Sequence, residues 1–127
     1  MRETILLFHF TDREKRNKVV SALFPLKLKI KEVEKKDYLQ TIGFLAGSTD
    51  ISPVEEEYDG EELEGEMLVM AGISGARMDM VLRALRKSGV GPIPYKAAMT
   101  PTNQYWNPLQ LFKEIKEEHE KMHGKEE

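Results

Sequence analysis

The segment TILLFHF, residues 4–10, and the segment MLVMAGI, residues 67–73, decide the fold. Both are apolar almost throughout, whereas a strand with one solvated face alternates between apolar and polar residues. Each is followed by residues that can begin a helix. The two segments are therefore predicted to be strands buried on both faces, at the centre of a sheet.

A helix is expected after each of these strands. Thr11, followed three residues later by Glu14, matches a capping box. Ser74-Gly75 opens the helix after the second strand. Its apolar residues recur at helical spacing, at Met78, Val81, Leu82 and Leu85.

Two further segments carry the marks of edge strands. Residues 26–33 begin by alternating, with apolar residues facing one way and Lys27, Lys29 and Lys31 facing the other. Residues 93–99 contain Pro94 near their start, which favours an edge position. A row of lysines hinders pairing with other chains. Because no aromatic residues interleave it, the row does not indicate a nucleic-acid site.

The remaining helices begin at Asp37 and at Asn107-Pro108, so the order is βαβα, a connection at residues 48–65, and βαβα again. This order predicts a small three-layer α/β/α domain with a four-stranded, mostly parallel sheet in the order 2-1-3-4. A two-layer ferredoxin-like sandwich is the alternative, but it needs a hairpin that the sequence lacks. We expect one domain over residues 1–123 and a frayed tail at 124–127.

Composition narrows the class of protein. The chain has 127 residues, of which 40% are hydrophobic and 32% charged, which is typical of a folded globular domain. It has no cysteine, which excludes disulfides, thiolate metal sites and a cysteine nucleophile. No apolar run approaches the roughly 20 residues of a membrane helix. With no targeting segment in view, we expect a cytoplasmic location and no membrane partner.

The charge is concentrated in one connection. Nine of the 22 acidic residues and none of the 19 basic ones fall between Asp50 and Glu66, although the net charge is only −3. A solvated loop, a lid and a contact for a basic protein partner are all compatible with this acidity. The charge balance does not indicate nucleic acid.

A ligand site is expected where the central strands end, because open α/β sheets bind ligands at the carboxyl ends of their strands. Three segments converge there if the strands are parallel, and the free N–H groups of helix starts favour an anion. Lysine or arginine side chains can complete such a site. The candidate residues are Thr11, Ser74, Gly75, Arg77, Lys96, Thr102 and Asn103.

Several familiar motifs are absent. Gly72-Ile73-Ser74-Gly75 is neither a phosphate-binding loop nor a dinucleotide fingerprint, and it lacks the final Gly of a nucleophile elbow. His119 and His123 fit the zinc-protease spacing H-E-x-x-H, but no rigid third ligand can follow so near the end of the sequence. We therefore expect neither a metal site nor a cofactor. His9 is interpreted as a hydrogen-bonded core residue, and Trp106 as an anchor for its loop.

Several stretches together resemble a bacterial family catalogued as domain of unknown function 3783. They are residues 37–40, 42–47 and 66–70, and the pattern Lys-Ala-x-x-Thr-Pro-Thr-Asn-x-x-Trp at 96–106, which is the most specific part. The resemblance extends over nearly the whole chain. It implies a stand-alone domain of unassigned activity, and it carries over no catalytic residue.

Three functional hypotheses follow. The first is a regulatory or binding domain that recognises a small anionic ligand or a protein partner through the crevice. The second is a small enzyme that uses Lys96 with Asp12 or Glu66 as acid and base groups, although no nucleophile–base pair is recognisable. The third is a structural interaction module that uses the acidic connection or an edge strand. The sequence predicts no oligomeric state.

Overall fold

The computed structural model describes residues 2–126, with the side chains of residues 2–121. Its sheet has the order β2-β1-β3-β4. All residues of the central strands β1 (Thr4–Phe8) and β3 (Met67–Ala71) are buried. The edge strands are β2 (Lys29–Val33) and β4 (Tyr95–Ala98), which are only partly buried. The predicted strand order, the two buried central strands and the two edge strands are confirmed.

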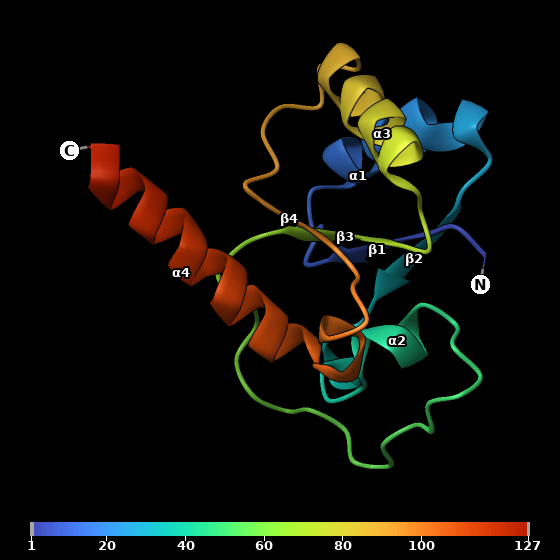
Figure 1. Ribbon diagram of the computed structural model, residues 1–127, viewed down its shortest axis with the longest axis vertical. Helices are drawn as coiled ribbons and strands as arrows, with labels where there is room; N and C mark the ends of the chain where they lie inside the picture. The colour runs from blue at the N-terminus through green and yellow to red at the C-terminus, as the bar shows by residue number, and fades with distance from the viewer. Residues whose placement is uncertain (1, 127) are drawn as a thin grey trace.

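Helices cover both faces of the sheet (Figure 1). The helices α1 (Arg13–Leu23) and α3 (Gly75–Lys87) pack on one face, where Val19 and Val81 are fully buried. The short α2 (Ile42–Leu45) and the long α4 (Pro108–Glu126) lie on the other face, where Leu111 and Phe112 enter the core. The molecule is therefore the three-layer α/β/α domain that the sequence predicts. The expected fraying at 124–127 falls outside the described side chains.

The orientation of the central pair differs from a doubly wound sheet. Strands β1 and β2 are parallel, as are β3 and β4, but β1 and β3 are antiparallel, with Thr4 opposite Ala71 and Phe8 opposite Met67. The right-handed crossover rule explains this. Both crossover helices, α1 and α3, lie on one face, while the crossovers run outward in opposite directions. Right-handed connections can satisfy both conditions only if β1 and β3 run in opposite directions.

This arrangement gives the domain an approximate internal two-fold axis between Leu6 and Val69, which lie opposite one another at the centre of the sheet. Each half is a βαβα unit. Asp12 and Ser74 cap the first helices of the two units, and residues with positive φ, His9 and Gly72, directly follow their central strands. In this correspondence Ile5 matches Leu68. Their neighbours on the edge strands, Ile30 and Lys96, therefore match as well.

Some element starts differ from the predicted ones. Asp12, rather than Thr11, caps α1, because its Oδ1 accepts from the backbone N of Glu14 at 3.0 Å and of Lys15 at 3.2 Å. Thr41, rather than Asp37, caps α2, and Asp37 lies in the 3-10 turn η2 (Lys35–Asp37). Strand β2 begins only at Lys29, because the preceding turn η1 (Phe24–Leu26) ends at Lys27 in a left-handed conformation.

The acidic connection is an ordered excursion that packs on the α2 side of the domain. The side chain of Gln40 exchanges two hydrogen bonds with the backbone of Val54, at 2.7 and 2.8 Å. Tyr58 stacks on Tyr38 with ring centroids 5.9 Å apart, and Leu63 is buried. These contacts hold the connection against the core while most of its carboxylates face solvent. Its predicted role as a contact for a basic partner stays a prediction.

Candidate functional site

The carboxyl ends of the two central strands do not meet in one crevice, because they lie at opposite ends of the sheet. Because β1 and β3 are antiparallel, Thr11 lies at one end of the strands, and Ser74 and Gly75 lie at the other end. The premise that these residues converge is therefore wrong. Ser74 lines a hollow of about 450 Å³ with residues from the ends of β3 and β4: Gly72, Ile73, Met99, Thr100, Pro101 and Gln104. None of the described cationic side chains lines it.

Arg77 is engaged within the fold. Its guanidinium donates to both carboxylate oxygens of Glu3, at 3.1 and 2.9 Å, and to the carbonyl oxygen of Leu26 at 2.8 Å. This charge-assisted pair fastens the start of α3 to the N-terminal segment. Arg77 therefore has little capacity left for a ligand anion.

The ion pair makes stability depend on pH. The hydrogen bond from Arg77 holds the pKa of Glu3 below its ordinary value of 4.5. A depressed carboxyl pKa contributes stability above the unfolded-state value, and the contribution disappears as pH falls through the folded-state value. We expect the Glu3→Gln variant to have a lower melting temperature than the wild type at pH 7. The two melting temperatures should become equal at a pH low enough to protonate Glu3 in both the folded and the unfolded state. A pH-independent difference in thermal denaturation would contradict this.

Asn103 and Thr102 belong to the turn that follows β4. Asn103 is buried; its Oδ1 accepts from the N of Thr100 at 2.8 Å, and its Nδ2 donates to the carbonyl oxygen of Ala98 at 3.0 Å. Thr102 is exposed and makes no capping hydrogen bond to η3 (Asn103–Tyr105). Trp106 packs partly against the core, as predicted, whereas Tyr105 is exposed. Asn103 therefore shapes the turn, and it also lines a hollow of about 320 Å³ together with Lys96, Glu114 and Glu118.

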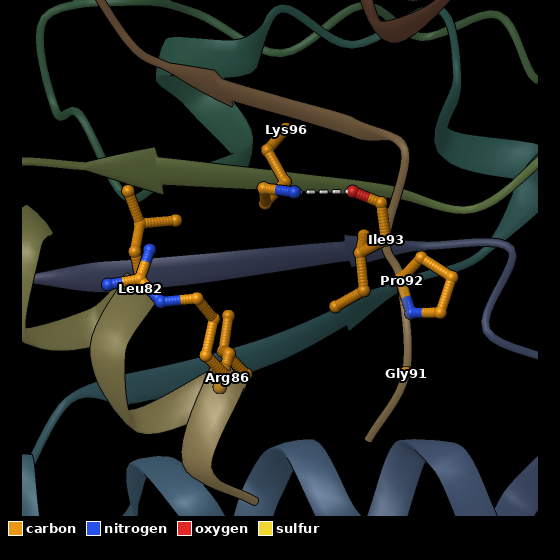
Figure 2. Close-up of a pocket in the computed structure, with 7 residues that line it drawn as sticks. Leu82, Arg86, Gly91, Pro92, Ile93 and Lys96 are labelled. Atoms are coloured by element: carbon orange, nitrogen blue, oxygen red, sulfur yellow. Dashed lines mark hydrogen bonds between the residues drawn. The ribbon is translucent and has the colours of Figure 1, made fainter. Parts of the chain in front are cut away.

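Lys96 is the predicted site residue that lines a pocket with an apolar wall. A pocket of about 220 Å³ lies between α3 and the segment that enters β4 (Figure 2). Leu82, Leu85 and Ile93 supply apolar walls, and Gly91 and Pro92 supply one side. Lys96 reaches into this region from the edge strand, and its Nζ donates to the carbonyl oxygen of Ile93 at 2.6 Å.

The pocket carries two positive charges. Arg86, near the C-terminus of α3, lines it together with Lys96. Within the described residues, no carboxylate lies within ion-pair distance of either side chain; the ion pairs there involve other cations. Partial burial lowers the pKa of Lys96, because an ammonium group loses hydration near apolar walls. The arrangement can therefore hold an anion whose body is apolar.

The internal two-fold axis provides a comparison within the molecule. At the place of Lys96, the first half has Ile30, which packs against the apolar core beside α1 and α3. A β4 strand with an apolar residue at this position would satisfy the same packing pattern. The lysine in the second half is therefore not required by the architecture.

The acid and base groups considered for an enzyme are engaged elsewhere. Asp12 caps α1. Glu66 forms an ion pair with Lys15 at 2.6 Å, and Lys15 also donates to the carbonyl oxygen of Pro92 at 2.9 Å. Among the described contacts, neither carboxylate reaches Lys96. The structure does not bring these groups together as a catalytic pair.

The histidine pattern near the C-terminus lies only partly within the described side chains. His119, on α4, sits edge-on to the ring of Tyr95 with centroids 5.6 Å apart, while the side chain of His123 lies outside the described part. Within the described residues, no group of three or more histidine, aspartate or glutamate side chains could hold a metal ion. Over the same range, no helix is both long and apolar enough to cross a membrane.

Sequence reasoning found Lys96 but missed the rest of this pocket. Arg86 is interpreted from sequence only as a basic residue suited to a helix C-terminus. The segment Gly89 to Pro94 could have indicated an irregular loop beside Lys96, because two glycines and two prolines in six residues prevent regular secondary structure. Gly89 and Gly91 both have positive φ, at 73° and 89°.

Comparison with known proteins gives one match. Residues 66–122, from the start of β3 into α4, match the family model described as Domain of unknown function (DUF3783). The match is shorter than the resemblance noted from sequence, since it omits the first βαβα unit and the acidic connection. No curated protein and no solved structure matches the chain. The matched segment contains Lys96 and the other residues that line its pocket, so this half of the chain is similar to the DUF3783 family.

Proposed function

We propose that this protein is a binding domain for a small organic anion, held in the pocket between α3 and β4. The observation that carries the proposal is the pair of cations, Lys96 and Arg86, beside apolar walls and without carboxylate partners among the described residues. A charged group of the ligand would form charge-assisted hydrogen bonds with these two side chains. The apolar part would lie against Leu82, Leu85 and Ile93.

The size of the pocket selects the class of anion. Its volume of about 220 Å³ is below the roughly 300–1,000 Å³ typical of sites for drug-sized ligands. Its walls are mostly apolar side chains, which cannot pair with the polar atoms of a sugar or nucleotide. A carboxylate with a short aliphatic or aromatic body fits both features. This proposal keeps the small anionic ligand predicted from sequence and moves its site from the strand ends to the α3–β4 pocket.

Titration with hexanoate, followed by amide and methyl NMR shifts, tests the proposal. We expect shifts at Leu82 and at residues 91–96, and at least a tenfold loss of affinity in Lys96→Met, since a hydrogen bond to a charged group contributes about 1.5–3 kcal/mol. Arg86→Met should weaken binding similarly. Arg83→Met is the matched control, because Arg83 is exposed on the same helix and does not line the pocket.

Two further ligands separate charge from apolar contact. Hexylamine has the same chain with the opposite charge, and acetate has the charge without the chain; both should bind this pocket much more weakly than hexanoate. The proposal is rejected if hexanoate causes no shift around the pocket, or if Lys96→Met and Arg86→Met bind it as well as the wild type does.

A further inference from the structure

His9 has a left-handed backbone conformation, at a position where a glycine would fit without strain. It directly follows β1 with φ 63°, in the left-handed region that few non-glycine residues occupy, although histidine does so more often than most. Its counterpart across the internal two-fold axis is Gly72, with φ 68°. Glycine adopts this conformation without strain. A histidine held in a conformation that glycine satisfies more easily suggests that its side chain has a use.

The imidazole of His9 adds no hydrogen bond to the fold. Its Nδ1 is buried and has no hydrogen-bond partner among the described residues. A buried polar atom left without a partner costs about 1–3 kcal/mol. The interpretation of His9 as a hydrogen-bonded core residue is therefore wrong. Its ring is half-buried and retains unused hydrogen-bonding capacity.

The ring lines a pocket of about 510 Å³ where β1 and β2 end. This is a different pocket from the one beside Lys96, and it is where the predicted site residue Thr11 lies. The other lining residues are Leu7, Phe10, Glu32, Val33, Glu34, Lys35, Tyr38 and Glu62.

Charge determines what this pocket accepts. Three carboxylates line it against one ammonium group, that of Lys35. Glu32 pairs with Arg16 at 3.0 Å, and Glu62 accepts from the hydroxyl of Tyr38 at 2.5 Å. Glu34 is exposed, and among the described ion pairs it contacts only Lys36, at 3.9 Å. An anion would meet repulsion here, whereas a cation would gain attraction from Glu34 and Glu62.

We propose that this pocket is a second ligand site, which binds a small cationic amine through an N–H group donated to the His9 imidazole and through the carboxylates of Glu34 and Glu62. Both interactions need a ligand with N–H donors and a positive charge, and an alkyl diamine has both. The site does not depend on the proposed anion pocket, because the two share no lining residue.

Histidine NMR during titration with butane-1,4-diamine tests this site in the full-length protein. We expect the ring resonances of His9 to shift in a saturable way, while those of His119 stay in place as an internal reference. Glu34→Gln should weaken binding at least threefold. Butyrate, with the opposite charge, should leave the His9 resonances unchanged.

Substitution of His9 separates binding from folding. His9→Gly should melt no lower than the wild type, because Gly72 occupies the equivalent turn, and should lose at least tenfold in diamine affinity. His9→Asn, which also tolerates the left-handed region, is the second variant should His9→Gly fail to fold. The proposal is overturned if the diamine leaves His9 unshifted, if a folded His9 variant binds it normally, or if butyrate shifts His9 instead. Binding of hexanoate near Lys96 is scored separately, so either site can fail alone.

Discussion

Phe8→Ala is expected to lower the free energy of unfolding by about 3–5 kcal/mol, the range for removing a buried phenylalanine ring. Phe8, the last residue of β1, is fully buried, and the centroid of its ring lies 6.1 Å from that of Tyr38. Truncation leaves a cavity that the neighbouring strands cannot close, because β1 is paired on both sides. Urea denaturation monitored by circular dichroism measures the loss.

Phe24→Ala is the matched control for this substitution. Phe24 is 77% exposed after α1, so the same truncation should change stability by less than about 0.5 kcal/mol. Phe8→Leu preserves most of the volume and should cost about 1.5 kcal/mol or less. Equal losses for Phe8→Ala and Phe24→Ala would contradict the placement of β1 at the centre of the core.

Asn103→Ala is expected to cost about 2–4 kcal/mol. The substitution removes one acceptor and one donor at once, and leaves the N of Thr100 and the carbonyl oxygen of Ala98 without their partners. Each unsatisfied buried group costs about 1–3 kcal/mol, less where water can enter. Amide hydrogen exchange at Thr100 should accelerate in the variant, which shows that the loss is local to this turn.

Two substitutions test this account of Asn103. Asn103→Asp keeps the acceptor for the N of Thr100 but loses the donor to Ala98, so its cost should be intermediate. Thr102→Ala alters the adjacent exposed residue and should change stability by less than about 0.5 kcal/mol. A cost for Asn103→Ala no larger than that for Thr102→Ala would show that the side chain does not hold the turn.

The sequence predicts the layers of this fold but not the direction of its central pair. The strands and their order follow from hydrophobic pattern and the crossover rule, which act within one βαβ unit. The relative direction of β1 and β3 depends on whether α1 and α3 lie on the same face of the sheet, and no local pattern encodes that. The choice of Asp12 over Thr11 as the cap is similar, because adjacent capping residues compete and tertiary contacts decide.

The candidate site was predictable only in part for the same reason. Lys96 is a candidate from sequence because it lies in the last strand, near the expected crevice, and within the most specific stretch of the family resemblance. Arg86 and Ile93 join it only after α3 packs beside β4. The conformation of His9 was not visible at all, since histidine in an apolar run predicts an ordinary strand residue.

The match to residues 66–122 covers a unit that contains only half of a sheet. Without the first βαβα unit, the backbone of β3 would be an unpaired edge of the sheet. The side chains of β3, which are at most 6% exposed in this protein, would then lie beside that edge. Such an edge invites pairing with any available strand. Here β1 occupies it. A polypeptide made of this unit alone would need to pair β3 with a strand of a second copy or of another domain before it could remain monodisperse in water.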